Sequence, residues 1–143
     1  MIALKLQFGA QFQAEKFHFR KGFSVFIEED GILSIGKGCF FNNNCSITAR
    51  KKVSIGRNCI FGENVKIYDH NHCYKDNNKL ICKQGFSSAE VVIEEDCWIA
   101  SNVVILKGVH IGKHSVIGAG VVVYKDVPAG SVLVCKQEVV NLH

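Results

Sequence analysis

Residues 91–123 read VVIEEDCWIASNVVILKGVHIGKHSVIGAGVVV, with an aliphatic residue at every sixth position. These positions are Ile93, Ile99, Ile105, Ile111, Ile117 and Val123. Four residues after each of them stands a small or β-branched residue, in order Cys97, Val103, Val109, Ser115, Val121 and Val127. A unit with one large and one small inward residue is typical of a short strand. Such units cannot bury themselves alone, so the pattern predicts a β-solenoid with three units in each turn and excludes helical bundles and doubly wound sheets.

The amino half of the chain repeats at a longer interval. Ile27, Ile47 and Ile67 are 20 residues apart. The steps within one turn are six, six and eight residues, so one corner of each turn carries two extra residues, within 29–34 and within 49–54. Gly and Asn gather near these corners, where a sharp bend favours residues that tolerate positive φ.

One long interruption breaks the repeat. Ile67 and Ile93 are 26 residues apart, and the polar, aperiodic stretch 69–90 between them is too long for a passive turn. We therefore expect an extruded loop, and such loops on rigid scaffolds often carry function. The predicted single domain, 1–143, divides into an N-terminal cap and entry strand at 1–26, coils at 27–68 and 91–128, the loop at 69–90 and a closing segment at 129–143. Phe8 and Phe12 are expected to cover the amino end of the solenoid, and Val132–Cys135 with Val139–Val140 the other.

Composition and charge restrict the classes of protein. The chain has 143 residues, of which 48% are hydrophobic and 21% charged, which argues against a disordered or collagen-like chain. No run approaches the roughly 18 apolar residues of a membrane helix, so no membrane span is predicted. Seven Cys cannot all pair, and with no signal-peptide pattern we expect a cytoplasmic location. The net charge of +4 is spread among acids, which argues against nucleic acid as a partner.

The cysteines and most histidines have structural interpretations. Four of the seven Cys fall four residues after a large apolar position and are predicted to be small buried hydrophobes, namely Cys39, Cys45, Cys59 and Cys97. There is no Cys-x-x-Cys pair to support zinc. A trio of His72, His110 and His114 resembles a β-helical carbonic anhydrase only in rough spacing, so no metal is predicted.

Two histidines and two lysines are the candidates for chemistry. His70 and His72 lie where the repeat breaks into the loop, a place that suits a general base, although a solvated loop histidine is the alternative. Lys107 and Lys125 are 18 residues apart and stack on one edge, either as a solvated edge or as a contact for phosphates.

With these repeats in place, residues 35–128 resemble the hexapeptide-repeat acyltransferases, in particular the O-acetyltransferases of the galactoside, maltose and capsular-polysaccharide type. Three motifs carry the resemblance: 41–47 (FNNNCSI), 67–72 (IYDHNH), and 92–101 (VIEEDCWIAS) with its continuation through 116–120 and 125–128. The resemblance implies an all-β, left-handed parallel β-helix of about five turns. It further implies a cytoplasmic homotrimer that transfers an acetyl group from acetyl-CoA to a sugar hydroxyl, with active sites between subunits.

The resemblance also implies the site residues. His72 is the expected catalytic base, and His70 is the second choice because it would need a two-residue gap. Asn42 is expected to bind the acceptor, Asp69 to orient the imidazole or the acceptor, and Trp98 to pack beside the thioester. Contacts to acetyl-CoA are expected from Ala100, Ser101, Ala119 and Lys125, with an oxyanion-binding backbone N–H near Ser101. Asn42 and the His72 loop would come from one subunit and the donor-binding turns from another.

Two departures from the family pattern and two alternative functions accompany these expectations. Ala100 replaces a common Gly, and 134–138 (VCKQE) lacks the Gly-x-Pro turn of relatives, which affects the expected details of donor binding. N-acetylation of an amino-sugar nucleotide is the alternative reaction. A non-catalytic β-helical binding or assembly module is the alternative outside enzymes.

Overall fold

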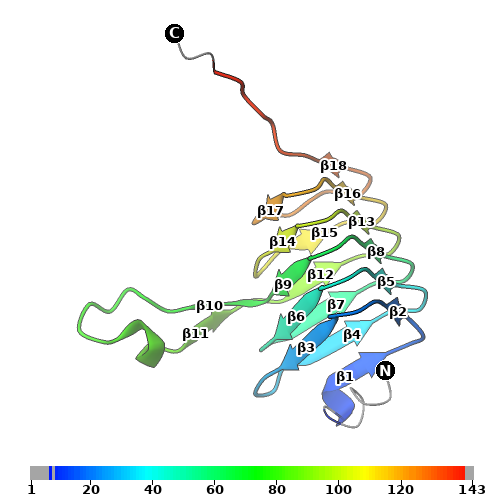
Figure 1. Cartoon of the computed structure of the whole chain (residues 1–143). Coiled ribbons are helices and arrows are strands. Elements are labelled where there is room, and N and C mark those ends of the chain that lie inside the picture. The colour runs from blue at the N-terminus through cyan, green and yellow to red at the C-terminus, as the bar shows by residue number, and fades with distance from the viewer. Residues whose placement is uncertain (1–6, 8, 141–143) are drawn as a thin grey trace.

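The computed structural model describes residues 7 and 9–140 and forms a parallel β-solenoid of about six turns (Figure 1). Three parallel sheets form its walls. Sheet A contains β1 (Phe12–Ala14), β4 (Ile32–Ile35), β7 (Lys52–Ile55), β12 (Val91–Ile93) and β15 (His110–Ile111). Sheet B contains β2 (His18–Phe19), β5 (Phe40–Phe41), β8 (Ile60–Phe61), β13 (Trp98–Ile99), β16 (Val116–Ile117) and β18 (Val132–Leu133). Sheet C contains β3 (Ser24–Ile27), β6 (Ser46–Ala49), β9 (Lys66–Tyr68), β14 (Val104–Ile105) and β17 (Val122–Val123).

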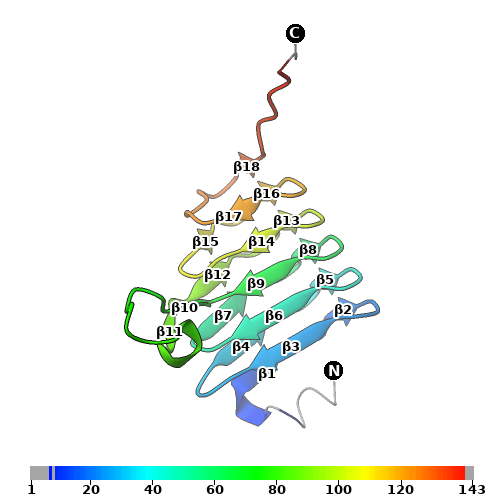
Figure 2. The same ribbon diagram turned by 60° about the vertical axis from the view of Figure 1, so that its left-hand side comes forward.

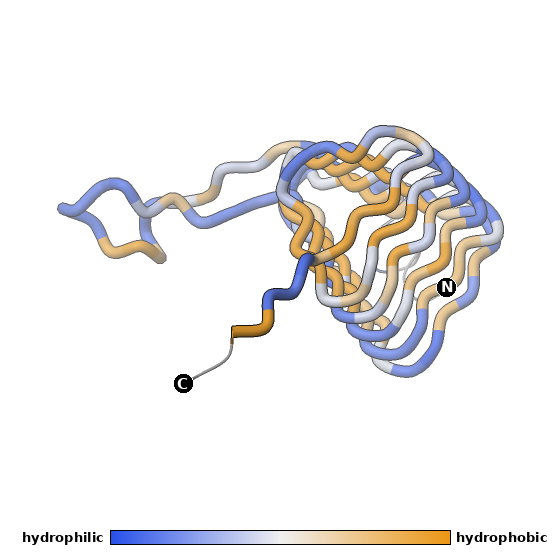
Figure 3. Tube along the Cα trace, turned by 90° about the horizontal axis from the view of Figure 1, so that it is seen from above, coloured by the Kyte–Doolittle hydropathy of each residue, from blue (hydrophilic) through white to orange (hydrophobic). Residues whose placement is uncertain are grey.

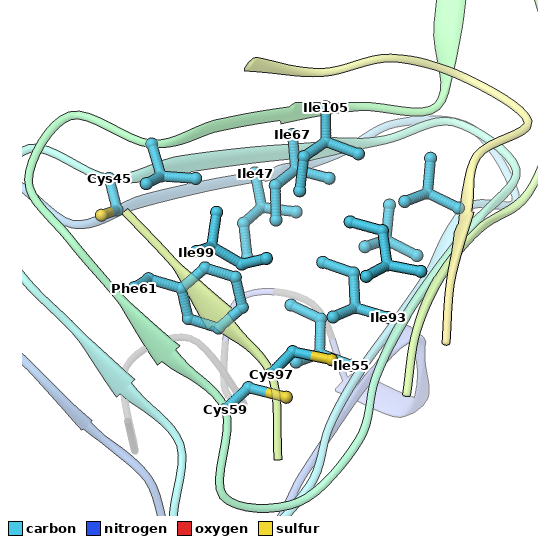
Figure 4. Close-up of a cluster of buried hydrophobic side chains, with 14 of the residues drawn as sticks. Cys45, Ile47, Ile55, Cys59, Phe61, Ile67, Ile93, Cys97, Ile99 and Ile105 are labelled. Atoms are coloured by element: carbon cyan, nitrogen blue, oxygen red, sulfur yellow. The ribbon is translucent and has the colours of Figure 1, made fainter. Parts of the chain in front are cut away.

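The predicted inward residues form the core. In sheet A, Ile55 pairs with Ile93, which pairs with Ile111, and the same alignment recurs in the other two sheets. Figure 4 shows these side chains pointing from the three walls into one shared interior. The residues four positions later, from Cys97 to Val127, are at most 6% exposed. The predicted solenoid and its phase are therefore confirmed.

The corners between sheets require left-handed backbone, as the sequence predicted. Asn44, Asn64 and Asn102 lie at the corner between sheets B and C, called corner BC, and have φ of 61°, 59° and 60°. Each stands three residues after a large inward residue, and Nδ2 of Asn64 donates to Oδ1 of Asn102 at 2.9 Å. Asn tolerates this region better than most residues because its short side chain can bond locally.

Residues 12–27 make a full first turn rather than a cap with an entry strand. β1, β2 and β3 pair in register with β4, β5 and β6, and Phe12 and Phe17 are buried in the core. The expectation of about five turns was therefore one turn short. Paired positions in this turn, such as Phe12 and Leu33 or Val25 and Ile47, are 21 or 22 residues apart, so the 20-residue interval does not detect it. Phe8 lies outside the described residues.

The carboxyl end closes the solenoid only in part. β18 adds to sheet B beside β16, but the chain then leaves the stack as an extended tail (Figures 1 and 2). Val139 and Val140 are 90% and 71% exposed in this tail, so the expectation that they cover the end was wrong for the single chain. They contribute no inward side chain because the tail forms no strand after Leu133.

The predicted loop leaves the stack at the corner between sheets C and A, called corner CA (Figure 3). It begins with β10 (His70–His72), passes through the 3₁₀ turn η2 (Ile81–Lys83) and returns along β11 (Phe86–Ser88). β10 and β11 pair antiparallel with each other, apart from the three walls. The other 3₁₀ turn, η1 (Gly9–Gln11), precedes β1, and no helix among the described residues is long and apolar enough to cross a membrane.

The four in-phase cysteines are buried wall residues, as predicted. Cys39, Cys45, Cys59 and Cys97 are no more than 1% exposed, and each thiol lies within hydrogen-bond reach of a backbone carbonyl in the neighbouring turn. Of the remaining three, Cys82 and Cys135 are exposed and Cys73 is half-buried.

Candidate active site

A completely buried carboxylate lies at the base of the loop. Asp69 follows β9 at the inward position that Ala49 occupies one turn earlier, since Tyr68 pairs with Thr48. Its carboxylate accepts hydrogen bonds from the backbone N–H groups of Arg50 (2.9 and 3.1 Å), Lys51 (2.7 Å) and Lys52 (2.8 Å). The eight-residue step in the preceding turn provides these three donors, because its extra residues turn their N–H groups toward the next turn.

His70 is held by this carboxylate. Its Nδ1 lies 3.1 Å from Oδ1 of Asp69, and its side chain is 14% exposed. The ring packs edge-on against Phe86 of β11, with 5.5 Å between centroids. When Nδ1–H donates to Asp69, Nε2 carries the lone pair, which is the tautomer that a general base requires.

His72 has different surroundings. It is exposed in β10, and its ring lies against Phe86 with 4.5 Å between centroids at an angle of 40°. Within the described part of the chain its ring nitrogens make no hydrogen bond. Asp69 therefore orients the imidazole of His70, the second choice from the sequence, and not that of His72.

Arg50 ties the loop to the preceding turn. Its guanidinium lies 3.6 Å from the centroid of the Phe86 ring and forms ion pairs with Glu28 and Glu29. The side chain of Arg50 is only 10% exposed. Phe86 is thus pressed between Arg50 and the two histidines, and this clamp was missed in the sequence. The signal that could have found it is the spacing, since Arg50 lies in the enlarged corner next to Asp69.

The predicted acceptor and donor residues lie at another corner. Asn42 lies at corner BC, where its Oδ1 accepts hydrogen bonds from Asn43 N–H (2.8 Å) and from Arg20 (3.4 Å). Ala100 and Ser101 lie at the same corner two turns later, and Ser101 Oγ accepts from the N–H of Glu63 at 3.1 Å.

Ala119 lies one turn further along corner BC, and Trp98 projects from sheet B with 51% of its surface exposed. Sheet C separates all of these residues from His70 within one chain. The structure therefore groups Asn42 with the expected donor turns, not with the loop.

Lys107 and Lys125 share corner CA with the loop, as their spacing predicted. Lys107 Nζ lies 2.5 Å from Oγ of Ser87 on β11. Lys125 is exposed one turn later, with Nζ 5.7 Å from the ring centroid of Tyr124. Two cations therefore extend from the base of the loop toward the carboxyl end of the solenoid.

The histidines outside the loop serve surface ion pairs. Nε2 of His110 lies 2.8 Å from Glu94, and Nδ1 of His114 lies 2.6 Å from Asp96. Both pairs are on sheet A or at its junction with sheet B, away from His72. No group of three or more His, Cys, Asp or Glu side chains in the described part of the chain is arranged to hold a metal ion.

Comparison with known proteins matches this architecture to one family. The family model described as bacterial transferase hexapeptide (six repeats) matches residues 90–125. A hexapeptide-repeat-containing acetyltransferase from Vibrio cholerae is 30% identical, over 92% of this chain and 72% of its own, with a TM-score of 0.76. The chain belongs to the hexapeptide-repeat acetyltransferase family. The resemblance drawn from the sequence motifs is thereby confirmed.

Other members extend the comparison. A structure of the same Vibrio protein in complex with acetyl coenzyme A covers 92% of this chain and 69% of its own, with 28% identity and a TM-score of 0.75. A maltose O-acetyltransferase from Clostridium difficile covers 92% of this chain and 67% of its own, with 27% identity and a TM-score of 0.74. A 2,3,4,5-tetrahydropyridine-2,6-dicarboxylate N-acetyltransferase from Staphylococcus aureus is 49% identical over 47 residues, 33% of this chain and a fifth of that relative's length.

Proposed function

We propose that this protein transfers the acetyl group of acetyl-CoA to a hydroxyl of a sugar acceptor, with His70 as the general base. The observation that carries the proposal is the pairing of His70 with the buried carboxylate of Asp69 at the base of the loop. The sugar O-acetyltransferase and the acetyl-CoA complex among its relatives support the choice of acceptor and donor. The proposal moves the base from His72 to His70.

The reaction follows from the orientation of this imidazole. Nε2 of His70 takes the proton of the acceptor hydroxyl as its oxygen attacks the thioester carbonyl carbon. The tetrahedral intermediate collapses by breaking the carbon–sulfur bond, and His70 returns the proton to the departing CoA thiolate. Asp69 stabilises the imidazolium that exists between these two proton transfers, because its carboxylate remains charged and bonded to Nδ1. Products are an acetyl ester and free CoA.

A second copy of the chain would complete the site. His70 lies at corner CA, while Asn42 and Ser101 lie at corner BC of the same chain, with sheet C between them. Contact between copies would bring corner CA of one to corner BC of the next. Exposed apolar side chains on sheets B and C support such contacts, including Ile60 (46%), Trp98 (51%) and Val122 (48%). We propose a homotrimer with three sites of this kind.

The donor site would run along these two corners. The N–H groups of Ala100 and Asn102 bond to carbonyls of Ile117 and Glu63, which leaves Ser101 N–H as the candidate oxyanion donor at this turn. Ala119 would contact the pantetheine arm from one copy, and Lys125 would contact phosphates from the other. Trp98 would pack beside the thioester. The missing Gly-x-Pro turn fits the tail that departs after β18, so the adenine end would be bound differently from the family pattern.

The test is release of free CoA thiol from acetyl-CoA in the presence of neutral sugars, acidic sugars and amino-sugar nucleotides. The proposal expects turnover with at least one sugar hydroxyl and calorimetric binding of acetyl-CoA. Absence of both turnover and acetyl-CoA binding would reject the enzyme and favour a binding or assembly module.

N-acetylation is the second candidate reaction, favoured by the match to the Staphylococcus aureus N-acetyltransferase. An amine attacks a thioester with less help from a base than a hydroxyl does. Turnover confined to amino acceptors, with little loss in His70→Ala, would support this candidate instead.

A further inference from the structure

The loop encloses a cleft of about 620 Å³ on the face of β10 and β11 that is turned toward the later turns. Its walls come from β10, the loop tip, η2, β11 and the corner that carries Lys107. Four of its lining residues are lysines, namely Lys75, Lys79, Lys83 and Lys107, and one is an acid, Asp76. No other pocket found among the described residues has more than one lysine in its lining.

The positive charge of this lysine cleft is largely uncompensated. Nζ of Lys79 lies 3.5 Å from Asp76, which is the one ion pair inside the cleft. Lys75 and Lys83 are exposed and form no ion pair with other described residues. Several ammonium groups around one hollow favour an anionic ligand, since a phosphate or carboxylate would accept charge-assisted hydrogen bonds from them.

The loop that carries these lysines is held in a defined shape. Gln84 accepts a hydrogen bond from the N–H of Asp76 at 3.0 Å and donates to the carbonyls of Asp76 and Lys79 at 2.9 Å each. The side chain of Asp76 also caps the N–H of Asn78 at 3.0 Å. The tip is therefore fastened to η2 by one buried amide, and the lysines project from an ordered frame rather than from a random coil.

The cleft begins next to the proposed base. Side chains alternate across β10, so His70 and His72 share one face with Phe86, and Asn71 lies on the other face with its partner Ser87. Asn71 and Ser87 form the inner wall of the cleft. A molecule with its reacting hydroxyl at His70 would reach the cleft by crossing the edge of β10, which requires more than a single sugar ring.

We propose that the lysine cleft binds an anionic group of the acceptor, located beyond the sugar that is acetylated. This inference rests on the proposed acetyl transfer and names its substrate class: an acidic oligosaccharide or a sugar nucleotide. The phosphates of acetyl-CoA are a poorer match, because the whole pantetheine arm separates them from the thioester that must meet His70. The two acceptor types share the anionic group, and separate probes distinguish them.

The experiment measures binding as well as turnover. Calorimetry with CoA present compares trigalacturonate, UDP-glucose and neutral maltotriose on the unchanged protein, on Lys75→Gln/Lys83→Gln and on the control Lys16→Gln/Lys37→Gln, whose lysines lie at the corner between sheets A and B. At least one anionic probe should bind about tenfold more tightly than maltotriose at low salt, and added salt should weaken this preference. The loop variant should lose the preference and the control should keep it, with the KM for acetyl-CoA unchanged in both.

Two outcomes would overturn the proposal: equal affinity for charged and neutral probes, or an anion preference that survives in the loop variant. A raised KM for acetyl-CoA in the loop variant alone would assign the cleft to the donor instead. His70→Ala separates this inference from the proposed function, because it should abolish turnover and retain anion binding. Anion binding without any turnover by the unchanged protein would reject the acetyl transfer and keep the cleft as an anion site.

Discussion

The Nδ1 atom of His70 lies 3.1 Å from Oδ1 of Asp69, and that carboxylate also accepts three consecutive backbone N–H groups from the turn below. The acid is completely buried, so these bonds replace the water it would otherwise need. One residue therefore joins the solenoid core to the loop. The orientation of His70 depends on the register between two successive turns.

Asp69→Asn should reduce both stability and activity. The amide NH₂ would replace an oxygen that accepts from Lys51 or Arg50, leaving buried donors unpaired at a cost of about 2 kcal/mol. The imidazolium would also lose its charged partner, so kcat should fall at least about tenfold. Urea denaturation and steady-state kinetics check both effects. Asp30→Asn, an exposed control, should change neither, and an Asp69→Asn enzyme with unchanged kcat would show that this carboxylate does not assist the base.

Loss of the clamp on Phe86 should lower kcat without changing the binding of acetyl-CoA. Arg50→Met keeps an apolar stem but removes the cation over the ring, an interaction of about 0.5–2 kcal/mol. His70 would then be held less firmly, and kcat should fall several-fold. Arg50→Lys should recover part of the loss. A change in the KM for acetyl-CoA with kcat intact would place Arg50 in donor binding instead.

The stacked aromatic pair in the core should matter for stability alone. Phe41 and Phe61 lie face to face with 4.4 Å between centroids and an interplanar angle of 9°, and each is 1% exposed. Phe61→Ala should lower the free energy of unfolding by about 3–5 kcal/mol through the cavity it leaves. Leu80→Ala, at a position that is 70% exposed in the loop, should cost far less. Similar losses in the two variants would contradict the assigned core.

Alkaline pH should destabilise the protein through its buried thiols. A hydrogen bond with the Cys39 thiol, together with burial, raises the pKa of Cys59 to about 12, and the pKa of Cys97 is raised by its contact with Cys59 and by burial. Their stabilising contribution is complete below the pKa of an unfolded cysteine and is lost as pH rises toward the folded value. Unfolding midpoints between pH values of about 8 and 11 should fall, and less steeply in Cys59→Ala. Equal slopes in both proteins would contradict this assignment.

The sequence predicted the solenoid because its core is periodic: Ile93, Ile99 and Ile105 repeat without exception, and the cysteines share the phase of the valines. The first turn escaped because its pairs are 21 or 22 residues apart. The lysines on corner CA follow from their 18-residue spacing.

The site was harder to predict because it depends on contacts between turns. Counting along a regular hexad favours His72, but the chain leaves the hexad immediately after Asp69, which turns inward where Ala49 lies one turn earlier. Arg50 belongs to the site through its contact with Phe86, 36 residues later, and no local motif marks that contact.

The most direct test of the proposed base is kcat for His70→Ala and His72→Ala, measured by CoA thiol release with the acceptor that the unchanged protein uses. His70→Ala should lower kcat at least about a hundredfold and leave the affinity for acetyl-CoA intact, while His72→Ala should keep kcat within a few-fold. A hundredfold loss in His72→Ala together with near-normal turnover in His70→Ala would contradict the assignment and return the base to His72.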